Sequence, residues 1–260
     1  MSKNTITTNN YQVTISNTLV RASYRLGFFE QRVLLGLAGK INPYVEVGVD
    51  RLVIQLTVEE FVTMFPQVSR KVAYEEFRTN LTENSNLAKD VLAFKLDKKR
   101  VITHWATKIE VEESVVTFTF NELIIPFLVN IRDNFTTYKL KWVAELKSPY
   151  SIRLYELFIC RINEVRRNLV IFTLDLLDLK GKFNLLDKYR GNSDFITKVL
   201  TPAVQDINEY TDLTIIYDDR KYIKEGRKIV GVRLVVQRKE NKTFISKNGG
   251  YKQVNMELAL

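Results

Sequence analysis

The side chains with the clearest capacity for chemistry in this sequence are cations gathered in a short stretch near its C-terminal end. Residues 220–228 read Arg-Lys-Tyr-Ile-Lys-Glu-Gly-Arg-Lys, so five of nine side chains are positively charged. Lysine and arginine spaced along a turn or hairpin are suited to phosphate, because they neutralise a polyanion without needing a fixed geometry. The stretch favours contact with a nucleic acid backbone, although a solvated basic loop would have the same composition.

Residue types that usually support enzymatic or metal chemistry are sparse. The sequence contains one histidine, His104, and one cysteine, Cys160, too few for zinc sites built on histidine pairs or for a thiolate cluster. No Gly-x-x-x-x-Gly-Lys-Ser/Thr motif of a P-loop is present. Asp218 and Asp219 could hold a metal ion, but their place at the end of a predicted strand favours a solvated turn. We therefore expect no enzyme, no metal and no cofactor.

Charge is distributed unevenly along the 260 residues. The net charge is +9; residues 1–130 carry 15 Lys and Arg against 14 Asp and Glu, whereas residues 131–260 carry 24 against 16. The second half should therefore bind a polyanion more strongly. No run approaches the roughly 18 apolar residues of a membrane helix, the first residues lack a secretory apolar segment, and a single cysteine suits a reducing compartment. We expect a cytoplasmic protein without a membrane partner.

The elements that would position the cations follow the order of a winged helix, which is a helix-turn-helix with an added hairpin. Thr173 is expected to cap a short helix and Ser193 a longer one. Pro202 lies inside the longer helix and predicts a kink or a later start, because proline removes a backbone hydrogen bond. Strands at 213–219 and 229–237 would then form a hairpin that carries the basic tip. A preceding amphipathic helix over 151–166 should expose Arg153.

The DNA contacts expected in the second half fall into two groups. A recognition helix presents side chains near its N-terminal end to base edges, while flanking cations bind phosphate. The apolar stripe that should face the core is Ile196, Leu200, Ala203 and Ile207. The side chains off this stripe that could face a groove are Asn192, Ser193, Thr197, Lys198, Thr201 and Gln205. The cations expected at phosphates are Lys188 and Arg190 before the helix and Arg220, Lys221, Lys224, Arg227 and Lys228 on the wing.

The first half repeats the same order less clearly. Thr57 and Glu60 have the spacing of a capping box at a helix start. Strands are expected at 91–108 and 115–120, with an acidic tip between them that suits phosphate poorly. The cations on the second helix of this half, which are candidate DNA contacts, are Arg70, Lys71 and Arg78. Acidic neighbours on that helix oppose phosphate, so either DNA contact or dimerisation could be the main role of this half.

These patterns predict an α+β fold of two tandem winged-helix domains. We expect a disordered N-terminus over residues 1–10 and an N-terminal winged-helix domain over 11–132 that contacts DNA. A C-terminal winged-helix domain over 133–238 should be the main DNA-binding unit, followed by a flexible tail over 239–260.

Three segments carry a resemblance to a known family. Residues 17–24 read Asn-x-Leu-x-x-Ala-Ser-Tyr, residues 151–157 read Ser-x-Arg-Leu-Tyr-Glu-Leu, and residues 200–212 contain Leu-x-Pro-Ala, Ile-Asn and Thr-Asp. In these segments the chain resembles the replication initiator proteins of iteron-containing, theta-replicating bacterial plasmids. The likeness extends from about residue 17 to residue 237.

The resemblance implies a plasmid replication initiator that binds directly repeated origin sites, the iterons, in double-stranded DNA as a monomer. It also implies a homodimer formed through the N-terminal domain that represses the protein's own gene, and it leaves host replication proteins open as further partners. A winged-helix transcription regulator without an initiation role is the alternative, because origin opening leaves no local sequence motif. Several direct repeats beside an A·T-rich segment upstream of the gene would favour the initiator.

Overall fold

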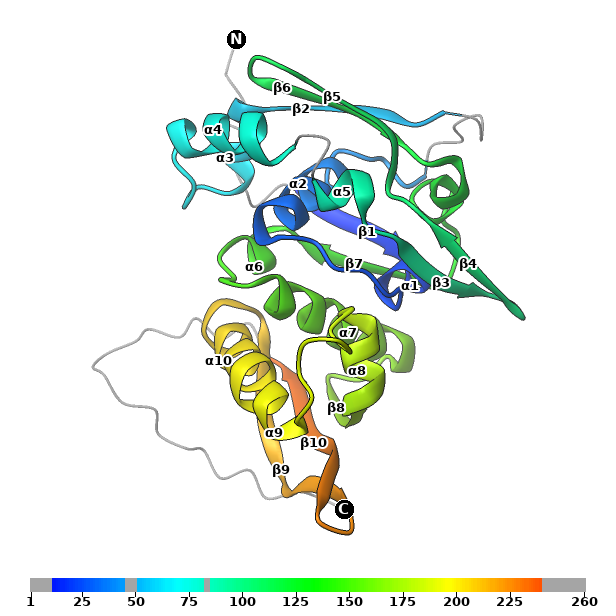
Figure 1. Cartoon of the computed structure of the whole chain (residues 1–260), viewed down its shortest axis with the longest axis vertical. Helices are drawn as coiled ribbons and strands as arrows, with labels where there is room; N and C mark the ends of the chain where they lie inside the picture. Colours follow the sequence, from blue (N-terminus) through cyan, green and yellow to red (C-terminus); the bar gives the residue numbers. More distant parts are fainter. Residues whose placement is uncertain (1–10, 45–50, 82–84, 240–260) are drawn as a thin grey trace.

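The computed structural model describes residues 11–44, 51–81 and 85–239, except for the side chains of Asp219 and Arg220. The segments predicted to be a disordered N-terminus (1–10) and, beyond Lys239, a flexible tail (240–260) lie outside the described residues. Figure 1 shows the two winged-helix modules one above the other, with the helix labelled α7 between them.

Helices and strands are interspersed along the chain. In the first part they are β1 (Gln12–Ser16), α1 (Asn17–Val20), α2 (Phe28–Ala38), β2 (Val53–Thr57), α3 (Val58–Met64), α4 (Arg70–Asn80), α5 (Asn86–Lys89), β3 (Leu92–Leu96), β4 (Lys99–Thr103), β5 (Ala106–Glu112), β6 (Val115–Phe120) and the 3-10 helix η2 (Glu122–Phe127). The later elements are β7 (Phe135–Lys139), α6 (Lys141–Ala144), α7 (Pro149–Val165), β8 (Leu169–Asp175), α8 (Leu176–Lys182), α9 (Asn192–Phe195), the π-helical turn η3 (Ile196–Leu200), α10 (Thr201–Tyr210), β9 (Leu213–Glu225) and β10 (Lys228–Arg238). The strands pair in antiparallel sheets of order β1-β7, β3-β4, β2-β6-β5 and β8-β10-β9.

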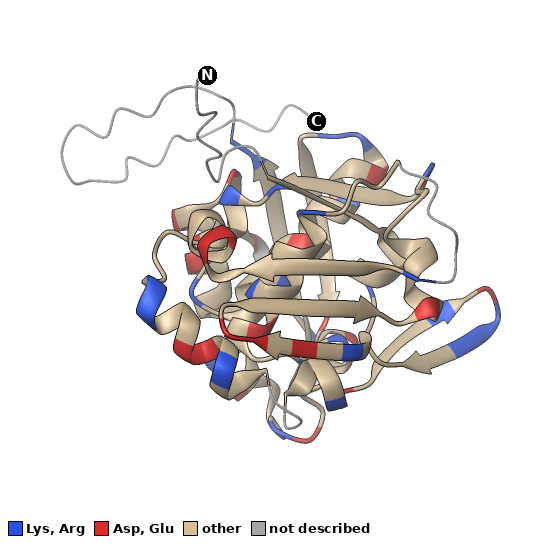
Figure 2. Cartoon of the chain, turned by 90° about the horizontal axis from the view of Figure 1, so that it is seen from above, with Lys and Arg blue, Asp and Glu red and all other residues tan. Residues whose placement is uncertain are grey.

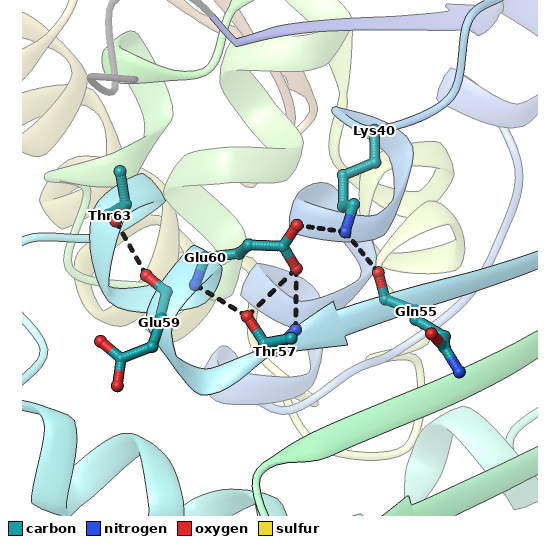
Figure 3. Close-up of polar contacts among 6 residues, drawn as sticks. All are labelled: Lys40, Gln55, Thr57, Glu59, Glu60 and Thr63. Atoms are coloured by element: carbon teal, nitrogen blue, oxygen red, sulfur yellow. Dashed lines mark hydrogen bonds and ion pairs between the residues drawn. The ribbon is translucent and has the colours of Figure 1, made fainter. Parts of the chain in front are cut away.

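The predicted capping box at the start of α3 is confirmed. The Thr57 hydroxyl accepts a hydrogen bond from the Glu60 amide at 3.1 Å, and the Glu60 carboxylate accepts one from the Thr57 amide at 2.9 Å. Lys40, just beyond α2, donates to the same carboxylate and to the Gln55 carbonyl (Figure 3). Partial burial alone would raise the pKa of Glu60, but these donors lower it below its ordinary value. The contacts tie α2, β2 and α3 together.

Aromatic rings fix α4 on this frame. The Phe61 ring of α3 lies 5.2 Å from Phe29 of α2 and 5.4 Å from Phe77 of α4, measured between centroids. Phe61 and Phe77 are fully buried, and burying a phenylalanine contributes roughly 1.5–3 kcal/mol. The outer face of α4 can therefore be polar without loss of the helix position.

The prediction of one strand over 91–108 is wrong in detail, because this segment forms β3, β4 and the start of β5. Asp97, in the turn between β3 and β4, adopts a φ of 53°, a left-handed conformation in which aspartate is enriched. This residue reverses the chain and makes a hairpin that projects at the right of the molecule in both whole-chain views (Figure 1, Figure 2).

Helix α7 is packed against both modules. Towards the second module, Phe158 packs on Phe172 of β8, with 4.6 Å between ring centroids. Towards the first module, α7 contacts β7, the strand that pairs with β1: Tyr138 of β7 donates a hydrogen bond to Glu156 at 2.6 Å. The Tyr155 ring of α7 packs edge-on against Tyr138 at 5.5 Å. The two modules therefore share one central helix.

Strand β7 lies at the start of the predicted second domain but pairs with β1, at the start of the first. Five residue pairs align, from Gln12 with Lys139 to Ser16 with Phe135. A division between residues 132 and 133 therefore separates two paired strands.

Arg153 is buried, and the prediction that it lies on the exposed side of its helix is wrong. It is 3% exposed and donates to the carbonyls of Val20 at 3.1 Å and Ala22 at 2.7 Å. It also donates to the Tyr24 hydroxyl at 2.8 Å and to the Glu156 carboxylate at 3.4 Å. The chain around α1 covers this side of α7, a long-range contact that helical periodicity does not report.

Candidate nucleic-acid interface

In the second module, α8 and the helix formed by α9, η3 and α10 make the helix-turn-helix. Asp175 caps α8, not the predicted Thr173, and its carboxylate accepts a hydrogen bond from the Asp178 amide at 2.7 Å. Thr173 stays in β8 because that strand continues its pairing with β10. The predicted cap at Ser193 is also wrong, since Gly191 occupies the N-cap position of α9.

The longer helix is distorted ahead of Pro202, which confirms the predicted irregularity. A π-helical turn over Ile196–Leu200 separates α9 from α10, which begins at Thr201. Proline lacks the N–H that a regular helix would donate to the Lys198 carbonyl, and a wider turn accommodates this loss. The predicted core stripe of Ile196, Leu200, Ala203 and Ile207 is buried. The opposite face of the helix is therefore left towards solvent.

The exposed side chains among those predicted to face a groove are Ser193, Thr197, Lys198 and Gln205. Lys198 forms an ion pair with Asp194 at 3.5 Å, with both side chains more than 60% exposed. Such an exposed pair contributes little, so Lys198 can exchange it for another acceptor. Thr201 is half-buried, and its hydroxyl shares a hydrogen bond of 3.2 Å with Tyr217 of β9.

Asn192 is held by hydrogen bonds within the module. Its Nδ2 donates to the Ile229 carbonyl of the wing at 2.6 Å, and its Oδ1 accepts from the Lys180 ammonium at 2.6 Å. Lys180 also donates to the Tyr189 carbonyl at 2.8 Å, and its burial lowers the pKa of its ammonium. Nothing in the sequence pattern distinguishes Lys180 from a solvated lysine, so its place in this site becomes visible only in the structure.

The strands of the wing are longer than the sequence predicts. β9 extends to Glu225 and β10 begins at Lys228, so the turn consists of Gly226 and Arg227. Gly226 has a φ of 59°, a left-handed conformation that glycine adopts without strain and that tight hairpins require. Most of the segment predicted as the basic tip, residues 220–228, is therefore strand.

The cations of the second module lie in the loop before the long helix and on the wing. Lys224, Arg227 and Lys228 are exposed on the wing, and Lys188 and Arg190 are exposed in the loop before α9. Lys221 is half-buried, with its ammonium 4.0 Å from the centroid of the Tyr217 ring. The side chain of Arg220 lies outside the described part of the chain. Because Asn192 bonds to Ile229, loop and wing lie next to each other and can contact the same polyanion.

The first module presents a surface of mixed charge. Arg70, Lys71 and Arg78 are exposed on α4, as predicted for side chains that reach DNA, but Arg70 pairs with Glu59 of α3 at 2.7 Å. The turn of its wing, between β5 and β6, contains the exposed Glu113. Figure 2 looks down on this module and shows Lys and Arg interspersed with Asp and Glu. It offers phosphate less net charge than the second module.

Two further features concern metal ions and membranes. Over residues 11–44, 51–81 and 85–239, no group of three or more His, Cys, Asp and Glu side chains is placed to hold a metal ion. Cys160 is buried, as expected for a core residue. No helix within these described segments is both long enough and apolar enough to cross a bilayer.

Comparison with known proteins gives matches over most of the chain. A family model described as "Initiator Replication protein, WH1" matches residues 12–159, and one described as "Initiator Rep protein, WH2" matches residues 175–236. A curated "Replication initiation protein" from Escherichia coli is 23% identical over 213 residues, which are 79% of this chain and 64% of that protein.

A solved structure shares the fold. The structure described as "Crystal structure of Pi initiator protein in complex with iteron DNA" superposes with a TM-score of 0.71, covering 90% of this chain and 99% of the other at 18% identity. The predicted fold class, an α+β arrangement of two tandem winged helices, is confirmed.

Proposed function

Because the chain belongs to the initiator replication protein family, we propose that it initiates plasmid DNA replication by binding directly repeated sites in duplex DNA. The chain spans 64% of the length of the curated relative, so the proposal depends on the surfaces of this chain itself. The observation that carries it is the second module, where a helix with an exposed polar face follows a loop with exposed cations and begins next to a wing with exposed cations. Phosphate contacts set the register on DNA, and the helix reads bases.

The side chains proposed to contact base edges are Ser193, Thr197, Lys198 and Gln205, because they are exposed on the helix. Lys188, Arg190 and the wing cations bind phosphate. Asn192 and Thr201 hold the site in shape, since their polar groups already have partners in the module.

We further propose that one monomer binds one repeat with both modules, and that a dimer formed through the first module represses the protein's own gene. Support comes from the nearly balanced charge of the first half, with 15 cations against 14 acidic residues, and from the Arg70–Glu59 pair on its helix-turn-helix. A module that holds phosphate weakly is free to use other surface for self-association. Sedimentation of the full chain, alone and with a single repeat, should show a dimer in the absence of DNA and one chain per repeat when bound.

A replicon test checks the initiation role. A plasmid that carries this gene and its flanking DNA as the sole origin should be maintained, whereas one encoding the Lys198→Ala and Arg227→Gln double variant should be lost. The initiator proposal is wrong if the wild-type plasmid fails to replicate in the bacterium that carries the gene while the protein still represses its own promoter. The chain is then a transcription regulator.

A further inference from the structure

Lys180 is a buried cation beneath the candidate interface. Its residue is 4% exposed, and its ammonium donates to the Tyr189 carbonyl at 2.8 Å and to the Asn192 Oδ1 at 2.6 Å. It also lies 5.6 Å from the centroid of the buried Phe195 ring. Among the residues that the structure describes, no carboxylate forms an ion pair with it.

Such a lysine is costly to keep. Removing an ammonium from water is unfavourable unless hydrogen bonds compensate, and burial lowers the pKa of Lys180 accordingly. Methionine would fill a similar volume without this penalty, much as apolar residues often replace buried charges without loss of stability. The feature that only the lysine supplies is its pair of hydrogen bonds to the loop and the start of α9.

Those hydrogen bonds continue into the wing. Asn192 accepts from Lys180 with its oxygen and donates with its nitrogen to the Ile229 carbonyl at 2.6 Å. A continuous series of hydrogen bonds therefore joins α8, the first residue of α9 and strand β10. Lys180 of α8 also bonds to Tyr189 in the loop that contains Lys188 and Arg190. Asn192 begins the helix that has the exposed face, and β10 belongs to the wing.

We infer that Lys180 and Asn192 form a clamp that fixes the recognition helix relative to the wing and so sets sequence discrimination, without either side chain contacting DNA. The inference rests on the proposed DNA-binding function. Cations on the wing anchor the protein to phosphates, and their distance from the helix decides which base edges its side chains reach. Hydrogen bonds to bases are broken by small displacements, whereas attraction of flexible cations to phosphate tolerates them. Loosening the clamp should therefore weaken specific binding selectively.

The test compares four full-length variants: Asn192→Ala, Lys180→Met, the double variant, and Lys182→Met as a control that removes the same charge from the same helix. Each variant is titrated against the direct repeat that the wild-type protein binds and against a scrambled repeat, at several salt concentrations. Without the clamp, the binding geometry must be restored when the protein binds the repeat, at a cost of up to about the energy of the lost hydrogen bond. Asn192→Ala and Lys180→Met should therefore each lose up to about tenfold in affinity for the repeat. On scrambled DNA, Asn192→Ala should match wild type and Lys180→Met should match the control. The double variant should bind like Lys180→Met on both DNAs, because both residues act through one connection and the Lys180 charge is absent from both proteins.

Other results overturn the clamp in distinct ways. A salt slope that falls by about one more in Lys180→Met than in the control means that Lys180 binds phosphate itself. Additive losses in the double variant mean that the two residues act separately. Relaxed preference at one base position in Asn192→Ala, with Lys180→Met normal, means that Asn192 reads a base.

Hydrogen exchange separates failure of the clamp from failure of the proposed function. If wild-type protein does not distinguish the repeat from scrambled DNA, the proposed function is wrong. In DNA-free protein, Asn192→Ala should still speed exchange of amides in α9 and at the wing turn, and Lys182→Met should not. Unchanged exchange in Asn192→Ala would overturn the clamp, and this variant carries the test by itself if Lys180→Met does not fold.

Discussion

At the scale of single residues, α7 buries an ion pair between Arg153 and Glu156. The side chains of Arg153 and Glu156 are 4% and 2% exposed and lie 3.4 Å apart. Burial raises the pKa of Glu156 above its ordinary value, although Arg153 and the Tyr138 hydroxyl partly offset this effect. Removing one partner of such a pair leaves the other charge without compensation in the core.

The first prediction concerns this pair. Arg153→Met should lower the free energy of unfolding by roughly 3–5 kcal/mol, measured by urea denaturation at neutral pH. The loss should shrink as the pH falls, because protonation of Glu156 removes the uncompensated charge. Arg161→Met, on the exposed face of the same helix, should cost about 1 kcal/mol or less. Equal losses in the two variants would show that the Arg153 contacts are not structural.

A second prediction at this scale concerns the exposed wing cations. Lys228→Gln and Arg227→Gln should weaken binding to repeat and scrambled DNA alike. Each should lower the salt slope by about one, because a cation that contacts a phosphate releases about one condensed counterion and the variant lacks that cation. Lys98→Gln, on the exposed turn of the β3–β4 hairpin, is the control. A wing variant that loses affinity only for the repeat would mean that the wing reads bases.

At the scale of elements, the helix of the second module should carry sequence discrimination. Thr197→Ala, Lys198→Ala or Gln205→Ala should reduce discrimination by roughly 1–3 kcal/mol for each well-formed hydrogen-bonding interaction with a base that the substitution removes. Competition titrations against repeats with single base changes would locate the position that each residue reads. Normal discrimination in all three variants would contradict the assignment of this helix to base reading.

The elements also show how far the sequence predicts structure. The capping box at Thr57 and the irregularity at Pro202 were predictable because each depends on residues within one helical turn. The burial of Arg153 and the strand state of Thr173 were not, since distant partners decide them: the chain around α1 and the strand β10. The exposed helix face followed from its apolar stripe, whereas the role of Lys180 depends on a loop geometry that no local pattern encodes.

At the scale of the whole molecule, the two modules are joined by shared structure. The predicted domains, 11–132 and 133–238, meet across the paired strands β1 and β7, and Arg153 of α7 donates to the Val20 and Ala22 carbonyls of the first domain. We therefore expect one cooperative unfolding transition. Native-state hydrogen exchange should give amides of β7 and β10 the same global opening free energy. Loss of β10 protection at lower denaturant than β7 would show instead that the second module unfolds separately.

The central claim, that this chain binds directly repeated sites, is tested most directly by DNase I footprinting on the DNA that flanks its own gene. Two modules that each occupy a groove one helical turn apart should protect about 20 base pairs per site. We predict several protected sites of one sequence in the same orientation, with the pattern abolished on scrambled DNA. Absence of protection, or protection of a single inverted repeat alone, would contradict the claim.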